Sequence, residues 1–387
     1  MSRYHALGQL PKKHHIQFRK PDGSLYVEQL VSTHGFSGPM STLYHINQPT
    51  EVKGWEDWGD VTVKYLESEP LRHRHLKTAR MEPKGNAVTG RVPLMGNHDV
   101  VWYQALIAEQ MPYFYKDAEG DEILFVHDGS GLMESMYGSL RFSPGDYIVI
   151  PRGTIYKLTF DSLPVRMLAI CTPGQVITPK RYRNDYGQFL EHAPFKERDF
   201  HGPTELPVYD EKGDFQVLIR ARNRLVMYTY PFHPLDVVGW DGYVFPYTFN
   251  INDFQPIVGK VHMPPPIHQT FQGQGFVICS FCPRMLDFHP EAIVVPYVHS
   301  NVDSDEILYY CNDKFGSRRG IEEGSITVHP LGIPHGPQPG AMEASIGAKR
   351  TEELAVMLDT YAPLKLTEQA LAIEDPEYWK SWQTNRS

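Results

Sequence analysis

The stretch PYVHSNVDSDEILYY (296–310), followed by GSITVHPLGIPHGP (324–337), decides the fold. It places His299 and Glu306 at the start of a predicted strand, and His335 after a Pro-Leu-Gly-Ile-Pro turn. Two neutral imidazoles and one carboxylate bind one face of an octahedral ion and leave the opposite face open. This donor set favours Fe(II), which can take up an organic substrate and O2 together.

The same pattern occurs a second time, earlier in the chain. The segment PYFYKDAEGDEIL (112–124) aligns without a gap on PYVHSNVDSDEIL (296–308). Each segment is followed by a Pro-x-Gly turn, PRGTIY from Pro151 and PLGIPH from Pro330. Self-similarity of this kind indicates duplicated supersecondary units. A chance match of Asp-Glu-Ile-Leu alone is the alternative, and the shared turns argue against it.

Only the later copy carries a complete metal-binding set. At the three ligand positions the earlier copy has Tyr115, Glu122 and Tyr156. Phenol side chains replace both imidazoles, so we interpret the first copy as a structural barrel without a metal.

The whole chain has the pattern of an all-β protein. Short Val/Ile/Tyr/Phe runs alternate with turns that draw on 32 Pro and 31 Gly. We expect two jelly-roll-like barrels, with domains at 1–225 (the degenerate copy at about 100–175) and 226–387. The segment KLTEQALAIEDPEYWKSW (365–382) has helical spacing and predicts a C-terminal helix. The basic segment RHRHLKTAR (72–80) is expected on a solvated or subunit-contacting surface.

The composition of the chain argues against nucleic-acid and membrane partners. The 387 residues are 41% hydrophobic, with a formal net charge of −9, which argues against nucleic-acid binding. No apolar run reaches the length of a membrane helix, and the N-terminus lacks a signal core, so we expect a cytoplasmic protein. Cys279 and Cys282 form a CxxC, but residues i and i+3 of a strand face opposite ways, which predicts core cysteines rather than a metal or redox pair.

These motifs resemble the homogentisate 1,2-dioxygenase family, bicupin-type iron enzymes of aromatic amino-acid breakdown. Besides the two quoted motifs, LDVVGWDGYVFPYTFNINDF (235–254), GDEILFVHDGSG (120–131) and PGDYIVIPRG (144–153) carry the resemblance. It implies two cupin barrels, one degenerate and one metal-binding. It also implies Fe(II)-dependent cleavage of homogentisate with O2 to maleylacetoacetate in tyrosine and phenylalanine catabolism. The assembly that it implies is a trimer-based homo-oligomer such as a hexamer.

Residue by residue, the resemblance assigns His299, Glu306 and His335 as iron ligands. The family's acid/base histidine matches His262 in KVHMPPPIH (260–268), with His268 close enough to be confused with it. Weaker assignments are contacts with the substrate or its surroundings, at Tyr297, Phe315, His329 and His289.

Four positions leave alternatives open. Asp305 precedes Glu306, and another placement of the gap makes Asp305 the ligand; the repeated Asp-Glu-Ile-Leu favours Glu306. Phe315 stands where a substrate-contacting tyrosine is expected, and Ser300 where an arginine is expected. Asn301 occupies the place of a further metal histidine in many cupins, which favours a three-ligand site with open positions.

Two other functions therefore remain in view. One is a dioxygenase for another dihydroxylated aromatic, such as gentisate or hydroquinone, suggested by Phe315 and Ser300. The other is a non-catalytic bicupin that binds a metal or small ligand. A cupin isomerase usually needs a fourth ligand, and Asn301 argues against it. The expected partners are a small aromatic acid and O2.

Overall fold

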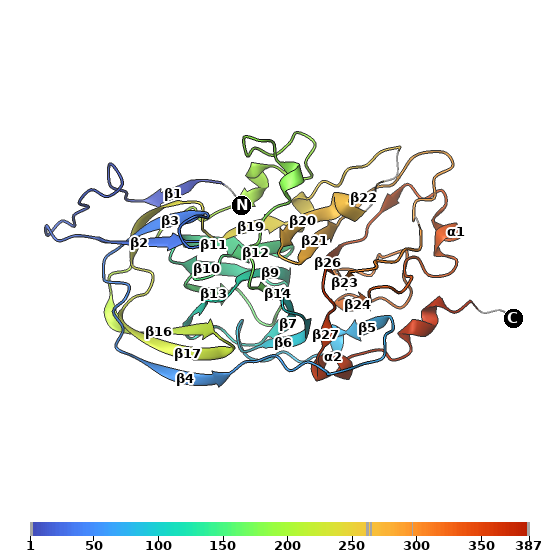
Figure 1. Cartoon of the computed structure of the whole chain (residues 1–387), viewed down its shortest axis with the longest axis horizontal. Coiled ribbons are helices and arrows are strands. Elements are labelled where there is room, and N and C mark those ends of the chain that lie inside the picture. The colour runs from blue at the N-terminus through green and yellow to red at the C-terminus, as the bar shows by residue number, and fades with distance from the viewer. Residues whose placement is uncertain (1–2, 261–262, 264, 296, 385–387) are drawn as a thin grey trace.

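Short β-branched and aromatic runs, separated by Gly- and Pro-containing turns, form strands throughout this computed structural model, which describes residues 3–260, 263, 265–295 and 297–384. The strands build two barrels, as Figure 1 shows, and confirm the all-β cupin class. Within the described ranges, no helix is long and apolar enough to cross a membrane. The helices are α1 (Ala341–Ser345), α2 (Glu368–Ala372), η1 (Thr78–Arg80), η2 (Lys180–Tyr182), η3 (Glu197–Asp199), η4 (Ile251–Asp253), η5 (Pro265–His268) and η6 (Tyr378–Trp382).

An eight-stranded sheet forms the middle layer. Its runs DEILFV (121–126) and DYIVI (146–150) are buried at every position, because both faces of the sheet are covered. In spatial order its strands are β15 (Phe200–His201), β19 (Tyr247–Asn250), β12 (Asp146–Ile150), β9 (Asp121–Asp128), β14 (Val165–Thr172), β7 (Val101–Ile107), β6 (Arg91–Gly96) and β27 (Lys365–Leu366).

A seven-stranded sheet covers one face of the middle layer and completes the first barrel. Several of its strands alternate buried and partly exposed residues, as expected with one face on the core. Leu140 and Leu158 pack in one core with Leu124 and Ile148 of the middle sheet. Its strands are, in order, β11 (Gly138–Phe142), β10 (Gly131–Ser135), β13 (Tyr156–Phe160), β8 (Phe114–Asp117), β16 (Lys212–Ala221), β17 (Arg224–Phe232) and β4 (Gly54–Asp60).

A six-stranded sheet covers the other face of the middle layer and belongs to the second barrel. Ile307 and Tyr309 share a core with Phe125 and Tyr147 of the middle sheet. The Tyr309 hydroxyl also lies 2.6 Å from Nδ1 of His127, across the two barrels. Its strands are, in order, β20 (Gln269–Gly273), β21 (Phe276–Phe281), β26 (Ala355–Thr360), β23 (Asp305–Tyr310), β24 (Ser325–His329) and β5 (Arg74–Lys77).

Two smaller sheets complete the strand inventory of the described residues. The four-stranded sheet consists of β1 (His5–Gly8), β18 (Val237–Gly242), β3 (Met40–His45) and β2 (Val27–Ser32). The two-stranded sheet pairs β22 (Arg284–Met285) with β25 (Arg350–Thr351) near the second barrel.

Strand β5 corrects the expected surface position of segment 72–80. It pairs with β24 at the edge of the second barrel, and Figure 1 shows it beside strands of the last third of the chain. Arg74, His75 and Leu76 are all buried. The segment looks polar, but its pairing partner lies about 250 positions later, which no local pattern reveals. The C-terminal helical expectation is confirmed by α2 and η6, which pack on β6 and β5.

Strand membership also differs from the expected domains. Residues 226–250, assigned to the second copy, instead add β17 and β19 to the sheets of the first barrel. The boundary between 225 and 226 falls inside β17. Where the chain divides into independently folding units stays a prediction. Cys279 and Cys282 lie in different cores, as the strand period predicts.

Candidate metal centre

Strand β23 presents Glu306 to the inside of the second barrel. Side chains of a strand alternate between its two faces. Ile307 and Tyr309 face the middle sheet, and Leu308 and Tyr310 belong to a small core on the opposite side. Glu306 shares the face of Leu308 and is buried at 6% exposure.

The neighbouring Asp305 has a different task. Its two carboxylate oxygens accept the backbone N–H groups of Leu331 (2.7 Å) and Leu364 (2.6 Å). Leu331 lies in the turn that leads to His335, so Asp305 fixes that turn. The carboxylate that faces the histidines therefore belongs to Glu306.

His299 and His335 are held together by their own backbones. The N–H of each donates to the carbonyl of the other at 2.8 Å, as in a hydrogen-bonded antiparallel pair. The turn before His335 depends on Gly332, whose φ of +74° suits glycine. Both imidazoles are thereby aimed from adjacent backbone segments.

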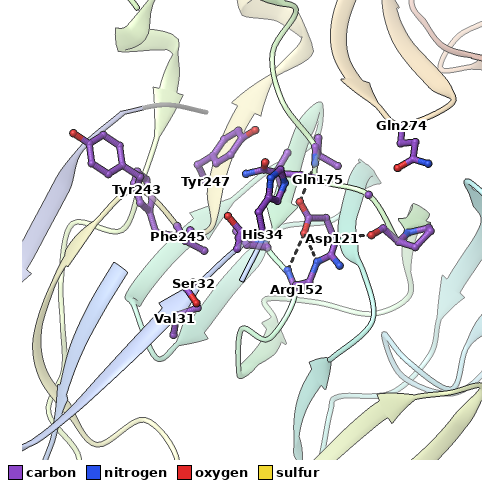
Figure 2. A pocket seen from close by; sticks show the side chains of 17 residues that line it. Val31, Ser32, His34, Asp121, Arg152, Gln175, Tyr243, Phe245, Tyr247 and Gln274 are labelled. Carbon is purple, nitrogen blue, oxygen red and sulfur yellow. Dashed lines mark hydrogen bonds and ion pairs between the residues drawn. The ribbon is translucent and has the colours of Figure 1, made fainter. Parts of the chain in front are cut away.

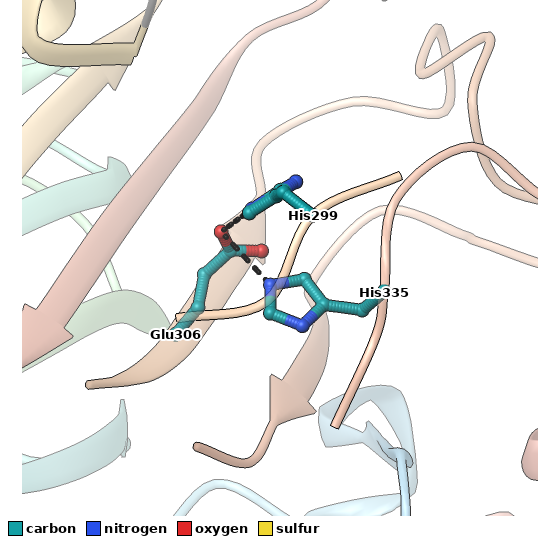
Figure 3. A group of neighbouring side chains, drawn as sticks. All are labelled: His299, Glu306 and His335. Carbon is teal, nitrogen blue, oxygen red and sulfur yellow. Dashed lines mark ion pairs between the residues drawn. The ribbon is translucent and has the colours of Figure 1, made fainter. Parts of the chain in front are cut away.

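The three side chains converge, as Figure 3 shows. Oε2 of Glu306 lies 3.5 Å from Nε2 of His299 and 3.6 Å from Nε2 of His335. One possible ligand atom from each residue lies within 4.8 Å of the others. His335 is fully buried, while His299 retains some exposure toward the pocket.

The donor set fits a divalent transition metal. Nδ1 of His335 lies 2.9 Å from the carbonyl of Ile333, and a carbonyl can only accept, so Nδ1 carries the proton. In the neutral ring Nε2 then bears a lone pair, and it is buried without a hydrogen-bond partner. A lone pair aimed at a carboxylate oxygen is stabilised by a cation between them. Two imidazole nitrogens and one carboxylate oxygen are common ligands of such ions.

His329 holds the other oxygen of the same carboxylate. Its Nδ1 lies 2.7 Å from Oε1 of Glu306, on the adjacent strand β24. Burial lowers the pKa of His329 to about 3, so the ring is neutral and donates from Nδ1. Burial alone raises the pKa of Glu306, but the hydrogen bond from His329 and the close imidazoles of His299 and His335 bring it well below its usual value. The carboxylate is therefore ionised.

A pocket of about 510 Å3 opens beside His299 and Glu306. Tyr297 and Phe315, two of the predicted substrate contacts, line it. The Tyr297 ring lies edge-on to that of His299, with centroids 6.1 Å apart. Phe315 packs edge-on against Tyr310 with centroids 4.8 Å apart and is almost fully buried.

Two other predicted residues stand apart from this result, one because the structure places it elsewhere and one because it is not described. His289 is exposed, and its Nδ1 accepts the backbone N–H of Glu291 at 3.1 Å; it does not line the pocket. His262 lies outside the described residues. The nearby His268 is buried, stacks on Phe281 with centroids 4.5 Å apart, and lines a small pocket that adjoins this one through shared lining residues such as Phe281 and Arg284.

The structure adds residues that the sequence analysis did not name. Arg318 lines the pocket. Asp359 stands opposite Glu306 on strand β26, with Oδ1 buried and without a hydrogen-bond partner among the described residues. Burial, followed by the charge of Glu306, raises the pKa of Asp359 well above its usual value. The ring of His73 packs at a tilt on Trp382, with centroids 4.4 Å apart, and lies edge-on to His329 and His335. The proximity of these positions to the site becomes visible only in the folded structure, because no local sequence motif marks them.

The first barrel repeats this geometry with other side chains. Tyr115 and Tyr156 pair across β8 and β13, as His299 and His335 do. The Tyr156 hydroxyl donates to Oε2 of Glu122 at 2.9 Å. Nη1 of the buried Arg91 lies 2.5 Å from Oε1 of the same carboxylate. A guanidinium thus neutralises the carboxylate that matches Glu306.

A second pocket, of about 460 Å3, lies on the first barrel and contains the counterpart of Asp305 (Figure 2). This counterpart, Asp121, accepts the backbone N–H groups of Arg152 (3.0 Å) and Val176 (2.9 Å). Arg152 belongs to the turn that leads to Tyr156. Both barrels therefore use the aspartate of Asp-Glu-Ile-Leu to fix the turn behind the third ligand position.

Relatives of this chain include enzymes with assigned reactions. A Saccharolobus solfataricus protein with a provisional dioxygenase name is 39% identical over 385 residues, covering 99% of each chain. Homogentisate 1,2-dioxygenase of Bradyrhizobium diazoefficiens is 27% identical, over 89% of this chain and 83% of its own length. The Nitrobacter hamburgensis enzyme of the same name is 29% identical, over 70% of this chain and 62% of its own length. Among solved structures, Bacillus subtilis oxalate decarboxylase is 10% identical with a TM-score of 0.35, over 81% of this chain and 84% of its own.

Two family models together cover most of the chain. The model described as homogentisate 1,2-dioxygenase N-terminal matches residues 54–251, and the corresponding C-terminal model matches residues 249–387. The candidate metal group of His299, Glu306 and His335 lies wholly within the second match. With this coverage and a relative 39% identical along nearly the whole length, the chain belongs to the homogentisate 1,2-dioxygenase family.

Proposed function

We propose that this protein is an Fe(II)-dependent dioxygenase that opens the ring of homogentisate with O2 and yields maleylacetoacetate. The observation that carries the proposal is the convergence of His299, Glu306 and His335 beside a pocket, in a chain of this family. Three protein ligands leave positions for substrate and O2 on one ion. When bound, Fe(II) supplies adjacent binding positions and passes electron density between the two reactants.

The protein's own residues prepare the site. His329 donates to Oε1 of Glu306 and keeps Oε2 toward the two metal-binding histidines. Tyr297 and Phe315 offer ring faces and edges to a flat aromatic substrate. Holding the ring next to the ion removes much of the entropic barrier to their encounter. In this proposal His262 accepts or hydrogen-bonds the proton of the second ring hydroxyl.

The test is oxygen uptake by protein reconstituted anaerobically with Fe(II). Homogentisate, gentisate and hydroquinone are offered in parallel, with His335→Ala as the inactive control. We expect uptake with homogentisate, and a His262→Phe variant that retains iron but loses most turnover. Full activity of His262→Phe would remove the acid/base assignment, and uptake with none of the three rings would favour a non-catalytic metal-binding bicupin.

A dioxygenase for another dihydroxylated ring is the second candidate. Phe315 supports it, because its ring offers no hydroxyl to a substrate carboxylate. Ser300 supports it too, since this exposed residue stands where the family resemblance implies an arginine. Uptake with gentisate or hydroquinone and none with homogentisate would establish this alternative while keeping the metal assignment.

We also propose a cytoplasmic, trimer-based homo-oligomer. The four cysteines, at 171, 279, 282 and 311, are all free, which suits a reducing compartment. Tyr297, Val298 and Val302 are apolar and 43–75% exposed near the metal site, where a neighbouring subunit would cover them. Light scattering at micromolar concentration should give a mass that is a multiple of three chains; a monomer mass would contradict the assembly.

A further inference from the structure

Arg318 lines the pocket that opens beside the candidate metal-binding group. It follows strand β23 in the loop that also carries Phe315, and it lines the same pocket as His299 and Glu306. Its Nη1 donates to the backbone carbonyl of Gly336, the residue after His335. The guanidinium is therefore tied to the backbone immediately after His335.

The charge state of the pocket singles out Arg318. The pocket's other three cationic side chains each pair with a carboxylate: Arg284 with Glu353 at 2.7 Å, Lys314 with Asp313 at 2.9 Å, and Arg350 with Glu352. Within the described part of the chain, Arg318 has no carboxylate within ion-pair distance. One positive charge of this pocket thus lacks a carboxylate counter-ion among the residues that the structure describes.

The partial burial of Arg318 raises the free-energy cost of leaving its charge unpaired. The side chain is partly buried, and its Nε is buried without a hydrogen-bond partner among the described residues. The guanidinium carbon lies 5.8 Å from the ring centroid of Trp382, which reduces its contact with water. A partly desolvated guanidinium is stabilised most by a planar carboxylate, because the two groups can form parallel hydrogen bonds.

Phe315 offers no hydrogen-bond donor that could bind a substrate carboxylate in place of Arg318. It occupies the same loop and lines the same pocket, but it has no hydrogen-bonding group. Its ring is fixed edge-on against Tyr310 in the small core. A carboxylate that enters the pocket therefore meets a donor at Arg318 rather than at position 315.

We propose that Arg318 binds the carboxylate of the aromatic acid and makes the site prefer acidic rings over neutral rings of the same shape. This assignment rests on the proposed function, since it presumes that a ring acid enters the metal-site pocket. Arg318 is then the residue that determines specificity, while the metal ligands determine the reaction.

The test compares binding of two ring compounds to unaltered protein and to Arg318→Gln, Arg318→Lys and Arg319→Gln. The probes are 2,5-dihydroxyphenylacetate and 2-methylhydroquinone, which share the ring and differ in the carboxylate. Dissociation constants are measured by calorimetry on zinc-loaded protein, so no turnover is needed. Arg319 is the matched control, because it is exposed, donates to the Pro339 carbonyl at 3.0 Å and does not line the pocket.

We expect Arg318→Gln to weaken binding of the acid about 10- to 100-fold, the range for loss of a charged hydrogen-bond donor, and to change the neutral ring by less than about threefold. Arg318→Lys should recover part of the loss, and Arg319→Gln should change neither constant. Equal weakening of both rings, with unchanged metal content, would assign Arg318 a merely structural role and overturn the proposal. If Arg318→Gln does not fold, unchanged binding of the acid by Arg318→Lys would overturn it as well.

Oxygen uptake separates this proposal from the reaction. Arg318-dependent binding without oxygen uptake by the Fe(II) form would remove the proposed dioxygenase function and keep the carboxylate site. Oxygen uptake from homogentisate with an unchanged KM in Arg318→Gln would keep the function and remove Arg318 as the specificity residue.

Discussion

At the scale of single residues, the two carboxylate oxygens of Glu306 face different partners. Oε1 accepts from His329, and Oε2 faces the two imidazoles that complete the metal-binding group. A ligand carboxylate held by an outer hydrogen bond cannot rotate freely, which keeps its metal-facing oxygen in place. Asp305, one residue earlier, contributes to the same geometry only through the backbone of the following turn.

Glu306→Gln and Asp305→Asn should therefore differ in metal content. Glu306→Gln removes a ligand charge and should lower metal affinity by more than the roughly 10- to 100-fold that loss of an outer partner costs. Asp305→Asn should keep its metal at saturation but lose about 1–3 kcal/mol of stability, because one buried backbone N–H loses its acceptor. Metal analysis of dialysed protein and thermal melts check both; the reverse pattern would make Asp305 the ligand.

The sequence predicts the three side chains that converge at the candidate metal centre, and Tyr297 and Phe315 of the pocket, but not Arg318 or Asp359. His299, Glu306 and His335 stand in repeated motifs, so their spacing alone brings them together. Arg318 does not stand out, because two adjacent arginines in a Gly-containing loop look like a solvated turn. Asp359 becomes visible only through the register of strands β23 and β26.

At the scale of elements, the Asp-Glu-Ile-Leu strand behaves alike in both barrels. Its aspartate fixes the next turn and its glutamate points inward, at Asp121 and Glu122 as at Asp305 and Glu306. This much follows from the internal repeat. That Arg91 neutralises Glu122 does not, because the arginine comes from strand β6, outside the repeated motif.

Arg91→Met should destabilise the first barrel. It leaves the buried Glu122 carboxylate without its counter-ion, and breaking a buried pair in this way costs about 3–5 kcal/mol. Adding Glu122→Gln should restore part of the loss, because the amide is neutral and can still accept from Tyr156. Urea denaturation gives the free energies of unfolding; an Arg91→Met protein as stable as the unaltered one would mean that the pair contributes nothing.

Strand β5 should make stability depend on pH. Burial lowers the pKa of His75 to about 4, and its Nε2 lies 2.8 Å from Oγ of Ser325 on β24. In the unfolded chain the pKa is about 6.5, so between pH 6.5 and 4 the unfolded state binds more protons. Stability should therefore fall with decreasing pH in this window, by up to about 1.4 kcal/mol per unit from this histidine.

His75→Gln tests this origin of the pH dependence. The amide can keep a hydrogen bond to Ser325 but does not titrate, so the fall in urea midpoint between pH 6.5 and 4 should become shallower. His98→Gln, which alters an exposed ring, is the matched control. An unchanged slope in His75→Gln would place the effect at other groups.

At the scale of the whole molecule, three stacked sheets share two cores. The middle sheet serves the first barrel on one face and supports the second barrel on the other. The second barrel also takes its edge strand β5 from the N-terminal part of the chain. Two barrels could be predicted from the repeat, but their mutual dependence could not, because the contacts join residues far apart in sequence.

Residues 252–387 should consequently not fold alone. Without β5 and the middle sheet, the apolar face that carries Ile307, Ile326 and Leu358 would be open to water. We expect such a fragment to lack a cooperative melt, and co-expression with residues 3–251 to restore one. Cooperative unfolding of the isolated fragment would show that the second barrel is an independent domain.

The two barrels obtain their positive charge from different sources. Arg91 is part of the polypeptide, whereas the candidate metal group at Glu306 would take its cation from solution. The charge balance of the first carboxylate is thus fixed by the sequence, while that of the second would vary with the supply of metal. A chelator would then disturb the charge balance at Glu306 while the Arg91–Glu122 ion pair stayed intact.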